Sequence, residues 1–226
     1  MSLARRARLS RSLFPVLPLV LGCVICSPAE GQWSFEAFGG TAVSANSPLT
    51  IHQDGYPTLR LDAQWDTRPL EPTIYYAVRV ARWWGKNGVF LSNIHHKLYL
   101  ANPTTEVPRF EVTYGYNLLA AGPAFRRGEW SLLAGAGPIL TNPASVVRGR
   151  SHLHSGGFFG TGYHLDGVQL QAGVNRRVHV ARALFLSADL LLSAGWAKVD
   201  IANGKAEVPN YAVHFLFGLG LGNRRR

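Results

Sequence analysis

The stretch from Tyr211 to Gly222 alternates strictly between large apolar residues and residues that are mostly small or polar. The large residues occupy every second position: Tyr211, Val213, Phe215, Phe217, Leu219 and Leu221. A period of two is that of a β-strand, whose successive side chains point to opposite faces of a sheet. One face of this strand is apolar enough to lie in hydrocarbon, and the other leaves room for a crowded, partly polar interior. The pattern therefore predicts a wall strand of a membrane barrel.

The same alternation recurs along the chain after residue 31. It is found in eight further segments: 33–38, 59–66, 74–81, 90–100, 109–118, 130–137, 168–175 and 185–196. No segment there supplies the long uninterrupted apolar stretch of a membrane helix. Aromatic residues fall at segment ends, as in the aromatic girdles of membrane barrels: Trp33, Trp65, Trp83, Trp84, Trp130, Trp196 and Tyr211. We predict an all-β fold, an antiparallel up-and-down transmembrane β-barrel.

Two features of this prediction stay open. Nine strands can be counted, whereas bacterial single-chain barrels use even numbers. A hidden strand between Thr141 and Gly167 would make ten, the count we favour, and eight strands result if the Trp33 segment or one other segment is not in the wall. A soluble β-sandwich or lipocalin-like barrel also alternates, with its apolar face buried instead of facing lipid.

The first 31 residues are typical of a secretory signal peptide. A basic leader with Arg5 and Arg11 precedes the apolar run Leu13–Ile25, and small residues follow at Ala29 and Gly31. We predict cleavage there, which leaves residues 32–226 as a single outer-membrane barrel domain. Alternatives are a membrane anchor, for which the run is short and interrupted by prolines, and a lipoprotein, because residues 20–23 faintly resemble a lipobox.

Both cysteines of the chain, Cys23 and Cys26, lie in this leader, so the mature chain has no thiol chemistry. The formal net charge is +10, and removal of four arginines and Glu30 with the leader leaves about +7. A signal peptide argues against nucleic acid as the partner of these charges. Anionic lipopolysaccharide or phospholipid headgroups fit better, and we predict a monomer without cofactor or metal.

The chain from about Gln32 onward resembles the small monomeric bacterial outer-membrane β-barrels, a class that includes OmpA-like, OmpX-like and lipid A-modifying barrels. The leader, the alternating strands, the aromatic strand ends and the final strand Phe215–Leu221 carry this resemblance. It implies the outer membrane of a Gram-negative envelope and recognition of the final strand by the barrel assembly machinery. That final strand usually ends on an aromatic residue, whereas this chain ends with Asn223 and three arginines.

Ionisable residues are unusually frequent on the face that parity assigns to the interior. They are Glu36, Arg60, Asp62, Arg79, His95, Lys97, Arg109, Glu111, Asp189 and His214. The interior of a small barrel is filled by side chains, and buried charges must pair and accept hydrogen bonds. We therefore predict a salt-bridge network that plugs the lumen. Glu111 is expected near a basic side chain of an adjacent strand, with Arg79, Arg109 and Lys97 as candidates.

The segment 91–97 offers the other chemistry, since Ser92, His95 and His96 lie close together in sequence. Serine and histidine side by side suggest a nucleophile and a general base. Lipid A deacylases similarly use a histidine and a serine on a barrel wall, but in a different order. Strict alternation puts Ser92 and His96 on the lipid side and His95 inside, which separates the pair. A metal site made of His95, His96 and Glu111 is no better, because adjacent histidines on a strand diverge.

Three functions follow from these observations. The first is a structural or lipid-interacting barrel with a polar, plugged lumen. The second is an envelope enzyme that modifies lipid A through His95 or His96. The third is a narrow channel for small polar or anionic solutes, which would be attracted by four basic residues: Arg60, Arg79, Lys97 and Arg109.

Overall fold

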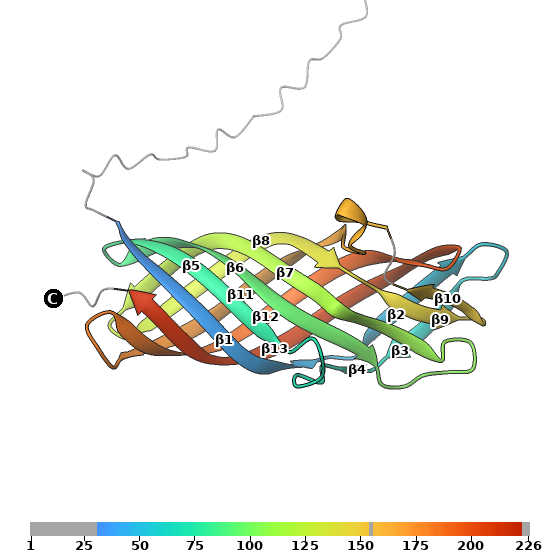
Figure 1. The fold of residues 1–226 in the computed structure, drawn as a ribbon, viewed down its shortest axis with the longest axis horizontal. Helices are drawn as coiled ribbons and strands as arrows, with labels where there is room; N and C mark the ends of the chain where they lie inside the picture. The colour runs from blue at the N-terminus through green and yellow to red at the C-terminus, as the bar shows by residue number, and fades with distance from the viewer. Residues whose placement is uncertain (1–30, 154–155, 223–226) are drawn as a thin grey trace, which may run out of the picture.

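The chain folds into an elongated antiparallel β-barrel (Figure 1), seen in a computed structural model that describes residues 31–153 and 156–222. Most of the predicted leader, both cysteines and Arg224–Arg226 lie outside the described residues. The elements are β1 (Gln32–Ser44), β2 (Ser47–Gln53), β3 (Leu59–Ala63), β4 (Trp65–Asp66), β5 (Tyr76–Trp84), β6 (Asn87–Leu100), β7 (Arg109–Arg127), β8 (Trp130–Thr141), β9 (Ala144–Val147), β10 (Arg150–Leu153), the 3-10 helix η1 (Phe158–Gly160), β11 (His164–His179), β12 (Leu184–Ile201) and β13 (Gly204–Gly222). Within the described ranges, no helix has the length and apolar character needed to cross a membrane.

Eight strands close the ring of the barrel in the order β1, β5, β6, β7, β8, β11, β12 and β13. The ring closes because β13 pairs antiparallel with β1, from Ser34 opposite Gly222 to Ser44 opposite Ala212. The predicted all-β antiparallel barrel is therefore confirmed. Of the two strand counts left open by the sequence, the described ring has eight.

The favoured count of ten differs from this ring for two reasons. Segments 59–66 and 74–81 pair along the same neighbour: Trp65 of β4 lies opposite Leu100 of β6, and Tyr76 of β5 lies opposite His95 of β6. They are two parts of one interrupted strand of the wall, separated by residues 67–75. Between Thr141 and β11, the strands formed by the described residues are β9 and β10, which are short and extend the sheet beside the start of β7.

The two ends of the barrel differ in their connections. Gln32 and Gly222 lie at one end, which we call the terminal end, together with short turns at 85–86, 128–129 and 180–183. The opposite end, which we call the loop end, carries η1 and the connections 54–58, 101–108 and 202–203 (Figure 1).

The outer wall next to the terminal end is a continuous apolar belt. Trp33, Trp84 and Trp130 are exposed at the edge of the belt nearest the terminal end, which we call the lower edge. Trp196 and Tyr211 lie edge-to-face, with ring centroids 6.0 Å apart, at the edge towards the loop end, which we call the upper edge. Between these aromatic rows the outward side chains include Phe35, Leu132, Leu170, Leu186, Leu190, Leu192, Phe215, Phe217 and Leu219. We call this surface the apolar belt. Rows of tryptophan and tyrosine on both sides of an apolar band are characteristic of membrane barrels.

Beyond the upper aromatic row the polarity of the two faces is exchanged. On the outer face of β12 and β13, Lys198, Asp200, Lys205 and Glu207 follow Trp196, and Lys205 Nζ donates to Asp200 Oδ1 at 2.7 Å. The inner face there is apolar and fully buried, with Leu49, Ile51, Leu98, Phe110, Val199 and Val208. The same alternation therefore builds a polar interior behind the apolar belt and an apolar interior at the loop end.

Candidate functional site

A buried ion-pair cluster crosses the interior of the barrel behind the apolar belt. Arg79 of β5 lies opposite Glu36 of β1 in register and donates from Nε to Glu36 Oε2 at 2.8 Å. The Nη1 group of Arg79 donates to Asp189 Oδ2 of β12 at 2.6 Å. The three side chains are between 0 and 5% exposed. One guanidinium therefore ties two neighbouring strands to a third strand across the lumen.

A second arginine and two neutral residues complete this cluster. Arg177 Nη2 donates to Glu36 Oε2 at 2.7 Å, and Arg177 Nε donates to Asn175 Oδ1 at 2.9 Å. Asn175 Nδ2 donates to Asp189 and to Ser187 Oγ, and Ser187 Oγ donates to Glu36 Oε1 at 2.7 Å. Two carboxylates thus meet two guanidinium groups, and every member is hydrogen-bonded, as buried charges require.

A layer of histidines lies between this cluster and the apolar interior of the loop end. His214 Nε2 is 2.7 Å from Ser193 Oγ, and His214 Nδ1 is 2.6 Å from the Tyr75 hydroxyl. The His96 ring lies 5.1 Å from that of His214, and His96 Nε2 is 3.2 Å from Asn210 Oδ1. Both histidines are fully buried. They fill the lumen on the loop-end side of the ion-pair cluster.

The faces predicted for the segment around Ser92 are wrong. Ser92 and His96 point into the barrel, where Ser92 Oγ accepts a hydrogen bond from Gln171 Nε2 at 3.0 Å. His95 points outward instead. The start of β6 decides which of its side chains point inward, because Phe90 is buried against Trp83 there and Leu91 is 60% exposed. Ser92 and His95 therefore lie on opposite faces and make no nucleophile–base pair.

His95 has a different hydroxyl neighbour on the outer wall. Its Nε2 atom is 2.8 Å from Thr73 Oγ1, and its Nδ1 atom is 2.9 Å from Asn117 Oδ1. Its ring stacks on Tyr76 with centroids 5.0 Å apart. Thr73 belongs to the segment 67–75 that separates the two pieces of the interrupted strand, a connection that the strand pattern does not reveal.

Several residues that parity assigned to the lumen lie outside it. Arg60 and Asp62 are exposed on β3, because Ala63 and Trp65 fill the interior there. Arg109 is exposed on β7, and it pairs with Glu111 on its own strand and not on an adjacent one. These residues lie in the loop-end half, where the outer face is the polar one.

Lys97 also differs from its predicted place in the lumen. It points outward and is covered by residues 67–75, where Nζ donates to the carbonyl oxygens of Arg68 and Glu71, both at 2.8 Å. Its side chain ties this segment to the outer wall of β6. The lysine is therefore not part of the ion-pair cluster.

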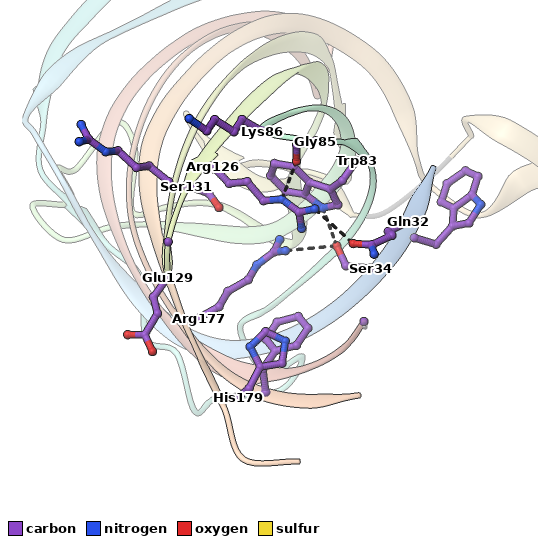
Figure 2. A pocket seen from close by; sticks show the side chains of 15 residues that line it. Gln32, Ser34, Trp83, Gly85, Lys86, Arg126, Glu129, Ser131, Arg177 and His179 are labelled. Carbon is purple, nitrogen blue, oxygen red and sulfur yellow. Dashed lines mark hydrogen bonds between the residues drawn. The ribbon is translucent and has the colours of Figure 1, made fainter. Parts of the chain in front are cut away.

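A pocket of about 480 Å³ opens at the terminal end. Figure 2 shows the side chains that line it. Its lining includes Lys86 and Arg127, and Arg126 and Arg177 approach Trp83 with their guanidinium carbons 4.8 and 5.0 Å from the indole ring. Neither Arg126 nor Arg177 is among the lumen residues predicted from the sequence. The alternation of β11 contained the signal for Arg177, which shares parity with Gln171 and Asn175.

Comparisons with known proteins find solved structures whose fold is similar to that of this chain. No family model matches it, and no curated protein is similar in sequence. The solved structures that are similar in fold include the following three. Ail of Yersinia pestis, in complex with the heparin analogue sucrose octasulfate, is 14% identical, with 85% of this chain and 99% of that chain covered and a TM-score of 0.39. The outer membrane protein OprG of Pseudomonas aeruginosa is 9% identical, with 86% and 97% covered and a TM-score of 0.48. Neisserial surface protein A is 8% identical, with 84% and 96% covered and a TM-score of 0.37.

Proposed function

We propose that this protein is a small outer-membrane β-barrel of a Gram-negative envelope, with a closed polar lumen and a structural or lipid-interacting role. The apolar belt between two aromatic rows supports the membrane location, because a soluble protein rarely exposes so large a continuous apolar surface. Export follows from the predicted signal peptide. The terminal end, with its short turns, would face the periplasm, and the loop end would face outward.

The ion-pair cluster is the observation that supports the proposal of a closed lumen. Arg79 spans the interior between Glu36 and Asp189, and Asn175 and Ser187 hydrogen-bond the remaining carboxylate oxygens. A passing ion would have to displace a guanidinium from two buried carboxylates. Breaking such a buried pair costs several kcal/mol, so the cluster acts as a plug.

The expected partners follow from this location. The apolar belt meets acyl chains, and the charged outer wall at the loop end meets lipopolysaccharide headgroups. The final strand, β13, offers the alternating pattern that the barrel assembly machinery recognises in the class resembled. A monomer is expected, because the ring closes on itself and leaves no strand edge along β1 and β13.

We predict that the purified full-length mature protein gives no conductance steps in planar lipid bilayers. The reason is the neutral, fully hydrogen-bonded cluster across the lumen. A steady conductance that changes in Arg79→Ala would instead support the channel for small polar or anionic solutes, and it would contradict the plug.

The second candidate is a lipid-modifying enzyme, and the Thr73–His95–Asn117 arrangement favours it. In this reaction Thr73 Oγ would attack the carbonyl carbon of an acyl ester while His95 Nε2 takes its proton. His95 would then return the proton to the leaving alcohol, and water would release the acyl group. Asn117 would hold the imidazole in place, as the third member of such arrangements does.

This candidate predicts a change in the lipid A mass spectrum when the protein is overproduced. The change should disappear in His95→Ala and in Thr73→Val, because both groups lie on the outer wall. Its matched control is Ser92→Ala, which removes a hydroxyl of the same strand that faces the closed interior and should leave the change intact. An unaltered lipid A profile on overproduction of the wild-type chain would contradict the enzyme.

A further inference from the structure

Asn93 of β6 points to the outer wall of the barrel. Its neighbours along the chain show this, because Ser92 points into the lumen and Leu91, on the same face as Asn93, is 60% exposed. Across the sheet Asn93 lies opposite Val78 of β5 and Leu119 of β7. An amide side chain is therefore surrounded by aliphatic side chains on the face that we assign to lipid.

Asn93 lies near mid-height of the apolar belt. Paired residues form a row that climbs once around the ring, from the terminal end of β12 to the upper edge of the belt. The members of this row are, in order, Leu186, Leu219, Ala37, Val78, Asn93, Leu119, Pro138, Val168 and Trp196. Asn93 is thus the midpoint of the row. The apolar band of membrane barrels is about 25 Å tall, so the amide lies roughly 12 Å from the upper edge.

The carbonyl end of this amide has no partner in the protein. Asn93 Oδ1 is enclosed, and no described residue donates a hydrogen bond to it. The next outward residue of the strand, His95, differs in this respect, because Thr73 and Asn117 contact its two ring nitrogens. Two polar side chains of one face therefore lie two residues apart, and the protein satisfies the hydrogen bonds of His95 but not those of Asn93.

An unsatisfied amide is costly at this depth. Acyl chains offer no hydrogen bonds, and water is absent from the middle of a bilayer. Polar side chains that are kept at such a depth commonly contribute to function. Asn93 is partly exposed, and the torsion of its amide is roughly two-fold. Rotation of the amide therefore presents either the carbonyl or the amino end to a molecule on the wall.

We propose that Asn93 binds a hydroxyl group carried in the far half of a lipid acyl chain. The inference rests on the membrane location proposed above, and it names the lipid chemistry that this wall prefers. A hydroxyl group both donates and accepts, so it satisfies the amide in either orientation. Each leaflet contributes about 15 Å of hydrocarbon, so a group roughly 12 Å deep belongs to the chain and not to the headgroup.

An acyl chain fits this place better than a second copy of the protein. Residues 67–75 stand on the outer face of β6, where Lys97 holds them through two carbonyl oxygens. Leu70 and Ile74 of this segment are 89% and 61% exposed. The wall of another barrel would meet this segment before it reached Asn93, whereas a single acyl chain is narrow enough to pass along β6.

Competition between two lipids that differ by one hydroxyl group tests the proposal. The mature chain is placed in nanodiscs with equal amounts of two phosphatidylcholines, one with an octadecanoyl chain and one with a 12-hydroxyoctadecanoyl chain. Native mass spectrometry then measures the lipid that the protein retains. We expect a preference of about two- to tenfold for the hydroxylated lipid, the ratio that one net hydrogen bond supplies. A 2-hydroxyoctadecanoyl chain, whose hydroxyl group lies at the edge of the belt, should show no preference that depends on Asn93.

Asn93→Leu and Leu91→Asn are the matched variants. Asn93→Leu should abolish the preference. In bilayers of unsubstituted phosphatidylcholine it should also raise the denaturant concentration at the midpoint of unfolding, because an apolar side chain of similar size replaces an unsatisfied amide. Leu91→Asn places the same amide on the same face, two residues away, and should lower that midpoint.

The outcomes separate this inference from the proposed function. Equal retention of the two lipids by the wild-type chain, or a preference that survives in Asn93→Leu, would overturn the hydroxyl site alone. A dimer that Asn93→Leu dissociates would also overturn it, in favour of an amide pair between two copies. An unchanged midpoint in Leu91→Asn would show that water covers this wall, and the membrane location would fail together with the inference.

Discussion

Replacing Arg79 by alanine should lower the free energy of unfolding by about 3–5 kcal/mol. The substitution leaves Glu36 and Asp189 enclosed without the guanidinium that bridges them at 2.8 and 2.6 Å. Arg177 still contacts Glu36, but among the described residues Asp189 then keeps only neutral Asn175 as a hydrogen-bond partner. Most of this loss in the free energy of unfolding comes from leaving a buried carboxylate without a counter-charge, and less of it comes from the lost attraction within the pair.

Denaturant unfolding in phospholipid bilayers, followed by tryptophan fluorescence, measures this loss. The matched control is Arg68→Ala, which removes an arginine that lies 3.1 Å from Asp66 with both side chains about half exposed. An exposed pair of that kind is worth about 0–1 kcal/mol. Similar losses in the two variants would show that the interior around Arg79 is hydrated, and the plug would fail with it.

Placing an arginine at Leu190 should destabilise the barrel in a bilayer by about 2–4 kcal/mol. Leu190 lies opposite Phe215 in the middle of the apolar belt, and the two side chains are 46% and 40% exposed on the outer wall. If this wall meets acyl chains, the guanidinium must snorkel to a headgroup or be dehydrated.

The control for this prediction is Gln64→Arg, a change to the same side chain on the exposed outer wall of the loop end. A surface substitution there should change the stability by no more than about 0.5 kcal/mol. Comparable tolerance at Leu190 would indicate that water, not lipid, covers the belt.

The sequence predicted the fold class because period-two alternation survives along most of the wall and is interrupted only locally, as in β7 and β11. In β12 and β13 one parity holds from end to end, and the outward residues were assigned as the structure places them. For Glu36, Arg79 and Asp189 the same parity led to the enclosed face, where the structure buries them. These residues lie in the belt, where the outer face is apolar and the rule of apolar outside and charged inside applies.

The rest could not be predicted, because alternation does not reveal where the belt ends. At 59–66 and 109–118 the outer face is polar and the apolar side chains fill the interior. The prediction that charged residues face the interior is therefore wrong for Arg60, Asp62, Arg109 and Glu111. Local periodicity is identical in the two environments. Only the position of Trp196 and Tyr211 along the three-dimensional wall marks the change.

Partners across the lumen were also beyond the sequence. The contacts of Asn175 and Arg177 with Glu36 join residues about 140 positions apart, as does that of Tyr75 with His214. Thr73 meets His95 only because residues 67–75 leave the wall and fold back over it. Such contacts depend on how the ring closes, which no single strand specifies.

The orientation of the wall is the claim on which the account rests. Both cysteines lie in the predicted leader, so the mature chain expected after its removal offers a cysteine-free background for single spin labels at Leu190→Cys, Phe217→Cys and Gln64→Cys. In bilayers the labels at 190 and 217 should collide readily with oxygen and poorly with a water-soluble nickel chelate, and the label at 64 should show the reverse. Ready collision of the nickel chelate at 190 and 217 would contradict the account.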